Sequence, residues 1–202
     1  PAWPGATTQA GDAWRALLGH MGATITLDEE GLTLSGPGVG NYPGIKATMA
    51  EVGELTPTLA AICAYASSPS HLSGIAHLRG HETDRLAALV TEINRAGGQA
   101  DETEDGLIIT PRPLHAAQIC SYADHRMATF GAILGLVTPA ITVDDITCTS
   151  KTLPTFEAMW ASLVGDDGRG SMDAGGSSEG QAHADDHRTV QATPASPIEE
   201  EQ

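Results

Sequence analysis

The sequence predicts an α/β (α+β) fold in which short strands alternate with amphipathic helices. Residues 12–21 and 83–96 each carry apolar side chains at helical spacing and are followed by a glycine. After each helix come two short apolar runs, separated by a polar turn that contains Gly31 or Gly106. The order helix, strand, turn, strand therefore occurs at least twice, which indicates a repeated supersecondary unit.

The remaining elements follow from periodicity and turn chemistry. Helices are expected over residues 7–21, 55–66, 83–96, 124–136 and 155–164. Strands are expected over residues 23–27, 32–34, 45–49, 71–75, 99–102, 107–110, 118–121, 141–143 and 146–149. Pro57 falls in the first turn of its helix, where a missing N–H costs little. The last strand is expected to carry the chain to Lys151.

Composition and charge limit the classes of partner. Hydrophobic residues make up 41% of the chain and aromatic residues only 4%, so the core should consist of Ala, Leu, Ile and Val. The formal net charge of −16 argues against nucleic acid and against an anionic membrane as partners. No apolar run is long enough to span a bilayer. Any anion site must therefore be a local basic pocket in an acidic protein.

Residues 165–202 differ in composition from the rest of the chain. They are rich in Gly, Ser, Ala, Asp and Glu and hold nine acidic residues against two arginines. Such a segment buries too little apolar area to offset the entropy of ordering it, so we expect a disordered acidic tail after a folded domain at residues 1–164. His183 and His187 are interpreted as part of this solvated tail rather than as metal ligands.

Three cysteines, Cys63, Cys120 and Cys148, are far apart and form no CxxC pair. This pattern favours buried free thiols over a zinc cage or a disulfide framework, and it suits a reducing compartment. No signal peptide is evident. A cytoplasmic location and no metal site are therefore expected.

Three motifs place a cation where a helix is expected to begin. They are Gly-His-Glu-Thr-Asp-Arg at residues 80–85, Ala-Asp-His-Arg-Met-Ala at 123–128 and Thr-Ser-Lys-Thr-Leu-Pro at 149–154. Free N–H groups at helix starts attract anions, and arginine forks bind carboxylate and phosphate. Arg85, Arg126 and Lys151 are therefore predicted to surround one multiply charged small ligand. Near the arginines, the pKa of Lys151 is expected to fall, which suits proton transfer.

Each residue also has a structural interpretation when it is taken alone. Arg85 could form a surface ion pair with a neighbouring acid, and Arg126 could follow a capping aspartate. A lone lysine such as Lys151 commonly serves solubility. Glu54 lies at a helix start, where the dipole favours any acid. Only the three motifs together favour a ligand site.

In this order, the three motifs resemble the 5-enolpyruvylshikimate-3-phosphate synthase family. Asp-His-Arg-Met-Ala at residues 124–128 matches the family in every residue, and the similarity runs from about residue 7 to 163. The resemblance implies stacked βαβαββ units, of which complete members hold three in each of two domains with the active site between them. This chain would then be part of the C-terminal domain of a two-domain inside-out barrel, with at least two units.

The resemblance also implies a reaction and its residues. The family transfers the enolpyruvyl group of phosphoenolpyruvate to the 5-hydroxyl of shikimate 3-phosphate, a step of the shikimate pathway toward chorismate and the aromatic amino acids. Arg85 and Arg126 would bind phosphoenolpyruvate, and Lys151 would also touch it as the acid near C3. Glu54 would be the base near the hydroxyl and Glu82 a second carboxylate near the donor. No metal or organic cofactor is implied.

The sequence departs from the family at four of these positions. His81 stands where lysine is usual and His77 where asparagine is common; both remain candidate substrate-binding residues whose charge depends on pH. Glu54 replaces the more frequent aspartate and is one methylene longer. Leu153 replaces an aromatic residue. His81 therefore contributes less certainly to binding than Arg85.

The resemblance covers less than half of a complete enzyme. The sequence begins at Pro1 and has no Lys-Ser-x-Ser-x-x-Arg motif, so we expect an inactive fragment that needs the missing N-terminal part. The complete enzyme is expected to be a monomer. Two alternatives stay open: a UDP-N-acetylglucosamine enolpyruvyl transferase, which shares the fold and the donor, and a non-catalytic phosphate-binding or interaction module.

Overall fold

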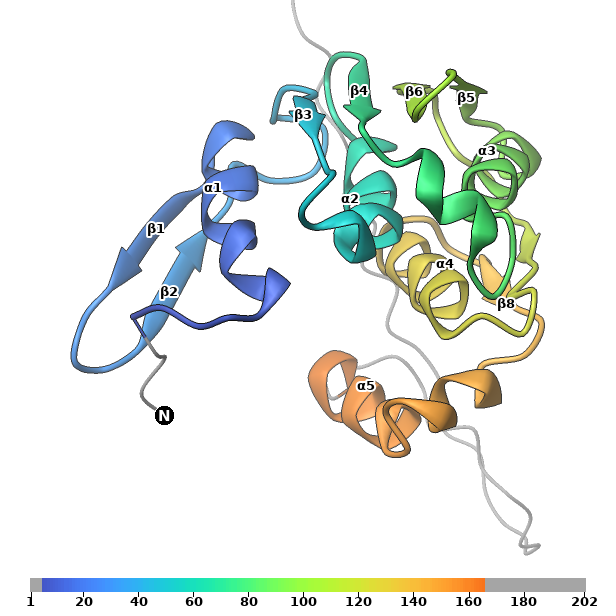
Figure 1. Ribbon diagram of the computed structural model, residues 1–202. Helices are drawn as coiled ribbons and strands as arrows, with labels where there is room; N and C mark the ends of the chain where they lie inside the picture. Colours follow the sequence, from blue (N-terminus) through green and yellow to red (C-terminus); the bar gives the residue numbers. More distant parts are fainter. Residues whose placement is uncertain (1–4, 166–202) are drawn as a thin grey trace, which may run out of the picture. The chain divides into compact units, whose positions relative to one another are not determined.

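One complete βαβαββ unit forms the middle of residues 5–165, which are the residues described by the computed structural model (Figure 1). Its elements are β3 (Lys46–Thr48), α2 (Thr56–Cys63), β4 (Ser70–Ser73), α3 (Arg85–Arg95), β5 (Gln99–Glu102) and β6 (Leu107–Thr110). The strands form a sheet in the order β3-β4-β6-β5. β3 pairs parallel with β4, and the other two pairings are antiparallel. This confirms the predicted fold class.

Partial units precede and follow the complete one. Before it, a 3-10 turn η1 (Ala10–Asp12) leads into α1 (Ala13–His20) and the antiparallel hairpin of β1 (Thr24–Leu27) and β2 (Leu32–Ser35). After it, β7 (Gln118–Ile119), α4 (His125–Val137) and β8 (Thr142–Val143) form a βαβ unit with parallel strands, and α5 (Phe156–Val164) follows. Three further 3-10 turns are η2 (Gly53–Leu55), η3 (Ala76–Gly80) and η4 (Thr147–Lys151).

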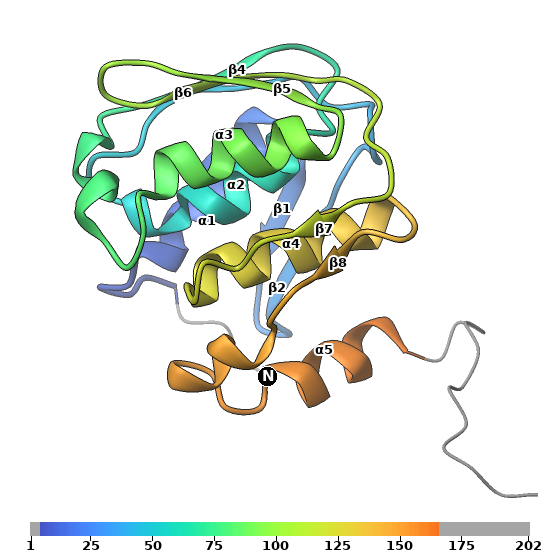
Figure 2. The same cartoon turned by 90° about the vertical axis from the view of Figure 1, so that its right-hand side faces the viewer.

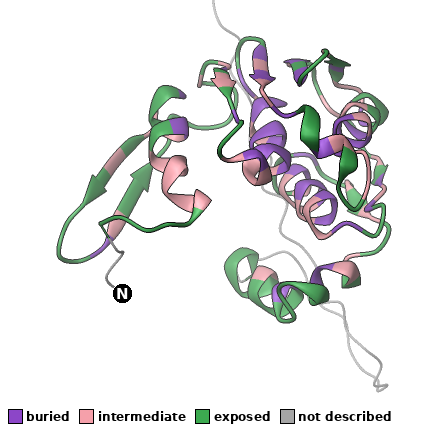
Figure 3. Ribbon diagram, viewed as in Figure 1, coloured by how far each residue is buried: buried purple, intermediate pink, exposed green. Residues whose placement is uncertain are grey.

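The sheet and the helices form layers around a shared core. Strands β4, β6 and β5 cover α2 and α3, and α4 packs against α2 (Figure 2). Leu59 of α2, Leu72 of β4, Leu89 of α3 and Phe130 of α4 are completely buried. The buried residues concentrate in these helices, whereas α5 is largely exposed (Figure 3). The core therefore holds together the elements that carry the predicted site.

The internal repeat is present as two αββ segments, α1-β1-β2 and α3-β5-β6. Gly22 and Gly97 both follow their helix with a φ of +90°, a conformation that side chains disfavour. The two turn glycines serve different purposes. Gly31 has a φ of +138°, whereas a Cβ at Gly106 would lie 1.9 Å from the carbonyl oxygen of Leu72. Sequence similarity alone hides that difference.

The prediction of a strand over residues 146–149 is wrong, because residues 147–149 belong to the 3-10 turn η4 and Ile146 is its N-cap. β-branched residues favoured a strand. However, Asp145 Oδ1 accepts from the backbone N–H of Thr147 (2.9 Å) and from its hydroxyl (2.5 Å), and the Thr149 hydroxyl donates to the Ile146 carbonyl (2.7 Å). Such local bonds compete with strand pairing. Lys151 therefore ends a 3-10 turn instead of beginning a helix.

The structure confirms only some of the other predictions. All three cysteines are free; Cys63 is buried as expected, but Cys120 and Cys148 are only half-buried. Between residues 5 and 165, no helix has both the length and the apolar character needed to cross a membrane. The expected disorder of residues 165–202, with its two histidines, falls outside the described residues except for Gly165. The division into domains stays a prediction.

Candidate active site

Arg85 is the most deeply buried cation of the site, with only 2% of its surface exposed. It is the first residue of α3, and the preceding Asp84 caps the helix by accepting from the N–H groups of Leu86 and Ala87, both at 3.1 Å. Aspartate is among the best residues for this position. The Thr-Asp-Arg sequence therefore starts the helix and directs Arg85 inward.

Asp124 is the buried partner of Arg85. The guanidinium donates from Nε to Oδ2 at 2.7 Å and from Nη2 to Oδ1 at 3.3 Å, a bidentate geometry. Asp124 also caps α4 by accepting from the N–H of Arg126 at 2.8 Å. Burial by itself would raise the pKa of Asp124, but the bonds from Arg85 and Arg126 outweigh it and hold that pKa below its ordinary value. This pair ties the first two motifs together.

Glu54 lies in η2 before α2, and its carboxylate contacts both Arg85 and Arg126. Oε2 accepts from Arg85 Nη1 at 3.3 Å and forms an ion pair with Arg126, whose Nη1 also donates to the Glu54 carbonyl at 2.8 Å. His81 Nδ1 lies 3.7 Å from Oε1 and 3.4 Å from Arg85 Nη1. The Glu54 side chain is 42% exposed, so this part of the cluster opens to solvent.

Lys151 joins the cluster through Glu82. Its ammonium donates to Glu82 Oε1 at 2.6 Å, and Glu82 Oε2 lies 3.3 Å from Nδ1 of His125. The hydrogen bond from Lys151 lowers the pKa of Glu82. The same bond raises the pKa of Lys151, so the expectation that this pKa falls is wrong. The nearest charge to Lys151 is a carboxylate instead of an arginine.

His77 lies at the edge of the cluster. It is exposed, its ring centroid is 6.0 Å from that of His81, and it packs over Gly53, where a Cβ would come within 2.8 Å of Nε2. Gly53 thus leaves room for the histidine beside Glu54.

The structure brings all predicted site residues into one connected cluster. The contacts run from Lys151 through Glu82, His125, Asp124, Arg85 and Glu54 to Arg126, with His81 and His77 alongside. Sequence reasoning treated Asp124 only as a helix cap. It missed that Asp124 pairs with Arg85 and that His125 lies between two carboxylates. The available signal for an ion pair was that Asp124 lies close to an arginine in its motif. The sequence does not show which distant cation its carboxylate contacts.

Potential metal ligands also occur in this cluster. Single ligand atoms of Glu82, Asp124 and His125 lie within 4.8 Å of one another. The two carboxylates are engaged by Lys151 and Arg85, so the described geometry is one of charge pairing between side chains.

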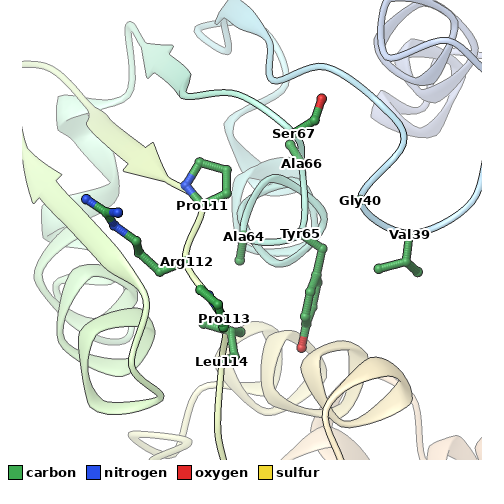
Figure 4. A pocket seen from close by; sticks show the side chains of 10 residues that line it. All are labelled: Val39, Gly40, Ala64, Tyr65, Ala66, Ser67, Pro111, Arg112, Pro113 and Leu114. Carbon is green, nitrogen blue, oxygen red and sulfur yellow. The ribbon is translucent and has the colours of Figure 1, made fainter. Parts of the chain in front are cut away.

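Two hollows differ in their charge. One of about 280 Å³ lies beside the cluster and is lined by His125, Arg126, Thr129, Thr149, Thr152, Leu153 and Phe156. A larger one of about 400 Å³ is shown in Figure 4 and lies between the end of α2, residues 39–40 and residues 111–114. There Arg112 turns away toward Gln99, to which it donates at 3.1 Å. The smaller hollow is therefore the one suited to an anion.

Comparisons with known proteins address the fold and the family. The sequence profile described as EPSP synthase (3-phosphoshikimate 1-carboxyvinyltransferase) matches residues 2–160. A 3-phosphoshikimate 1-carboxyvinyltransferase from Kocuria rhizophila is 56% identical over 168 residues, which is 83% of this chain and 37% of that protein. The chain thus spans well under half the length of this relative.

Solved structures agree with the sequence comparison. An EPSP synthase from Acinetobacter baumannii is similar with a TM-score of 0.65 and 25% identity, over 75% of this chain and 38% of that one. The enolpyruvyl transferase NikO from Streptomyces tendae has a TM-score of 0.58 over 75% and 35%, and at 15% identity it shows the fold alone.

The fold is therefore that of the enolpyruvyl transferases, and its candidate site gathers cations from three motifs. Within that class the profile match over residues 2–160 is decisive. The chain belongs to the EPSP synthase family.

Proposed function

We propose that this chain supplies the phosphoenolpyruvate-binding side of an EPSP synthase active site. The enzyme would transfer the enolpyruvyl group to the 5-hydroxyl of shikimate 3-phosphate and release phosphate. One observation carries the proposal: three motifs separated by about forty and twenty-five residues meet, together with Glu54, in a single cluster of two arginines, a lysine and three carboxylates. Helix capping and solubility would not require the residues of these motifs to lie together.

The arginines would grip the anionic groups of phosphoenolpyruvate. Arg126 is 33% exposed and shares the Glu54 carboxylate with Arg85, so an incoming carboxylate or phosphate can replace Glu54 as their acceptor. That exchange would free Glu54 to accept a proton. His81 and His77 would donate hydrogen bonds at the solvent side.

Within the Lys151–Glu82 pair, the lysine would donate the proton to C3. The raised pKa of Lys151 and the lowered pKa of Glu82 place the proton on the lysine, so Lys151 is the available donor. Donation from Lys151 to C3 accompanies attack of the 5-hydroxyl oxygen on C2, while Glu54 accepts the hydroxyl proton. C3 then returns a proton to the Lys151 amine as the C2–O bond to phosphate breaks, and the proton on Glu54 passes to the leaving phosphate, which leaves the enolpyruvyl ether and inorganic phosphate.

The remaining aspects of the proposal concern partners. The residues that hold shikimate 3-phosphate are expected in the part of the relatives that this chain does not span. Free thiols favour a cytoplasmic location, and the net charge of −16 disfavours nucleic acid. A monomeric complete enzyme belongs to the same proposal.

Calorimetric titration of the 202-residue chain with phosphoenolpyruvate tests the binding site. Arg126→Gln should weaken binding about tenfold or more, because a charge-assisted bidentate contact is lost. Arg112→Gln is the matched control, since Arg112 contacts only Gln99 among the described side chains, and it should bind as the unaltered chain does. Equal affinity in both variants would contradict the proposed site.

Turnover is a separate question from binding. Phosphate release should be measured with both substrates, first for the chain alone and then after addition of the remaining segment from the Kocuria rhizophila relative. We expect no turnover alone and measurable turnover after complementation. Phosphoenolpyruvate binding without turnover in either case would favour a phosphate-binding module. Turnover with UDP-N-acetylglucosamine in place of shikimate 3-phosphate would favour the other transferase.

A further inference from the structure

The backbone just before Asp124 adopts a conformation that is costly for its residues. Tyr122 and Ala123 have φ angles of +55° and +54°, in the left-handed region that residues with a Cβ rarely occupy. A residue held there costs about 1–3 kcal/mol unless its surroundings impose the conformation. Two such residues in succession, directly before the carboxylate that pairs with Arg85, require something that holds the loop.

Glu92 holds the loop from α3, while Asp144 Oδ1 accepts from the Ser121 N–H at 2.8 Å. The Glu92 carboxylate is completely buried. Oε1 accepts from the Tyr122 hydroxyl at 2.7 Å, and Oε2 accepts from the Cys120 N–H at 3.1 Å and from Arg95 Nε at 3.0 Å. A buried carboxylate is expensive unless it is satisfied in this way. Burial, followed by the bond to Glu92, raises the pKa of Tyr122 to about 12, so its hydroxyl remains the donor.

Helix α3 therefore contacts the loop at two points. Arg85 and Glu92 are seven residues apart, which places them on one face of the helix about two turns from each other. Arg85 holds the loop at Asp124, while Glu92 holds it at Cys120 and Tyr122. The segment between these contacts contains the two left-handed residues.

We propose that Glu92 and Tyr122 are positioning residues that impose the backbone of residues 122–124, so that Asp124 receives Arg85 in the orientation used for ligand binding. The ligand part rests on the proposed function; the orientation of Arg85 does not. Neither residue has a described hydrogen bond or ion pair with Arg85, Arg126 or Lys151, and Glu92 acts through Tyr122 and Cys120. The loop backbone transmits the constraint to Asp124, which also caps α4 at Arg126.

Tyr122→Phe tests the proposal because it removes one hydroxyl and keeps the ring. The readout is hydrogen exchange of the Arg85 Nε–H, which donates to Asp124 at 2.7 Å and should be resolved by NMR as a slowly exchanging side-chain signal. We expect exchange at least about tenfold faster and phosphoenolpyruvate binding several-fold weaker, with the far-UV circular dichroism unchanged.

Tyr65→Phe is the matched control. The Tyr65 hydroxyl donates to the Leu134 carbonyl at 2.8 Å and contacts Thr138, at the opposite end of α4. It loses a comparable hydrogen bond but should leave the exchange of the Arg85 Nε–H unchanged. Equal acceleration in both variants would overturn the proposal, as would unchanged exchange in Tyr122→Phe.

Glu92→Gln keeps the shape of the side chain and decides the question if Tyr122→Phe does not fold. It should also accelerate exchange of the Arg85 Nε–H, and the double variant should be no faster than the faster single one, because both act through the same contact. Additive effects would contradict this coupling. If the unaltered chain does not bind phosphoenolpyruvate, the proposed function fails, while the exchange measurements still decide the role of Glu92.

Discussion

At the scale of single residues, the site depends on one buried ion pair and several exposed ones. Arg85 and Asp124 are 2% and 0% exposed, whereas the side chains of Lys151 and Glu82 are 67% and 29% exposed. Exposed pairs contribute about 0–1 kcal/mol, but removing one partner of a buried pair leaves an uncompensated charge. The buried pair therefore controls stability, and the exposed cations remain free to exchange partners.

Asp124→Asn should lower the free energy of unfolding by about 3–5 kcal/mol, because the buried Arg85 guanidinium loses its bidentate counter-ion and keeps only the longer contact, at 3.3 Å, to the partly exposed Glu54. Asparagine still caps helices, so loss of the cap is not the main cause. Urea denaturation measures the change. Glu102→Gln, which removes the half-exposed partner of Arg79, should cost about 1 kcal/mol or less. Similar losses in the two variants would contradict the dominance of the buried pair.

Stability should fall in acid because the pKa of Asp124 is depressed in the folded chain. Its contribution is fully present above the unfolded pKa of about 3.9 and is lost as the pH falls through the lower folded value. Unfolding free energies measured between pH 6 and 3 should therefore decrease steeply below about pH 4. Asp124→Asn should flatten that decrease. If the unfolding free energy of the variant fell equally steeply, the loss of stability in acid would come from other carboxylates.

At the scale of elements, short connections decide where side chains point. Asp84 and Asp124 each have an extended backbone conformation and cap α3 and α4, so each arginine follows its cap at a set position. Asp145 has a comparable effect on η4, because it accepts from both donors of Thr147. The turn then presents Lys151 to Glu82 across a long sequence separation.

Gly106→Ala should destabilise the βαβαββ unit by about 1–3 kcal/mol, the usual cost of overpacking. The added Cβ would lie 1.9 Å from the Leu72 carbonyl oxygen, so β4 or the turn must move. Thermal unfolding followed by circular dichroism measures the effect. Gly19→Ala is the control within a helix; nothing lies within 4 Å of its added Cβ, and it should stabilise α1 slightly. If Gly106→Ala left the thermal unfolding unchanged, the close approach of Gly106 to the Leu72 carbonyl oxygen would be refuted.

At the scale of the whole molecule, a small cluster of cations is embedded in an acidic chain. The net charge is −16, and the three cations of the cluster lie beside three carboxylates, Glu54, Glu82 and Asp124. The overall field repels polyanions, whereas a small anion feels mainly the adjacent guanidinium groups. The molecule should therefore distinguish ligands by size as well as by charge.

The chain should bind phosphoenolpyruvate but not duplex DNA at about 0.15 M salt, where long-range attraction is screened beyond about 8 Å. Electrophoretic mobility shift with DNA and calorimetry with phosphoenolpyruvate, in the same buffer, measure both. Comparable affinity for DNA would show that the basic cluster is an extended surface and would contradict a small-molecule site.

Local patterns in the chain were enough to predict the repeat, most element positions and the three cation motifs. Helical spacing, caps and glycine stops depend on neighbours in the chain, so the extents of β5 and β6 were predicted as observed and α3 within two residues at each end. Local reasoning failed where hydrogen bonds close to the backbone outweighed β-propensity, as in η4.

Only the tertiary structure decided which charges meet. Asp124 could be read as a cap, but its role as the buried counter-ion of Arg85, 39 residues away, depends on how α3 and α4 pack. The pKa of Lys151 rises because folding places Glu82 beside it, against the expectation from its arginine neighbours. Burial and long-range ion pairing depend on distances that the order of residues does not state, and these distances set the charges of the site.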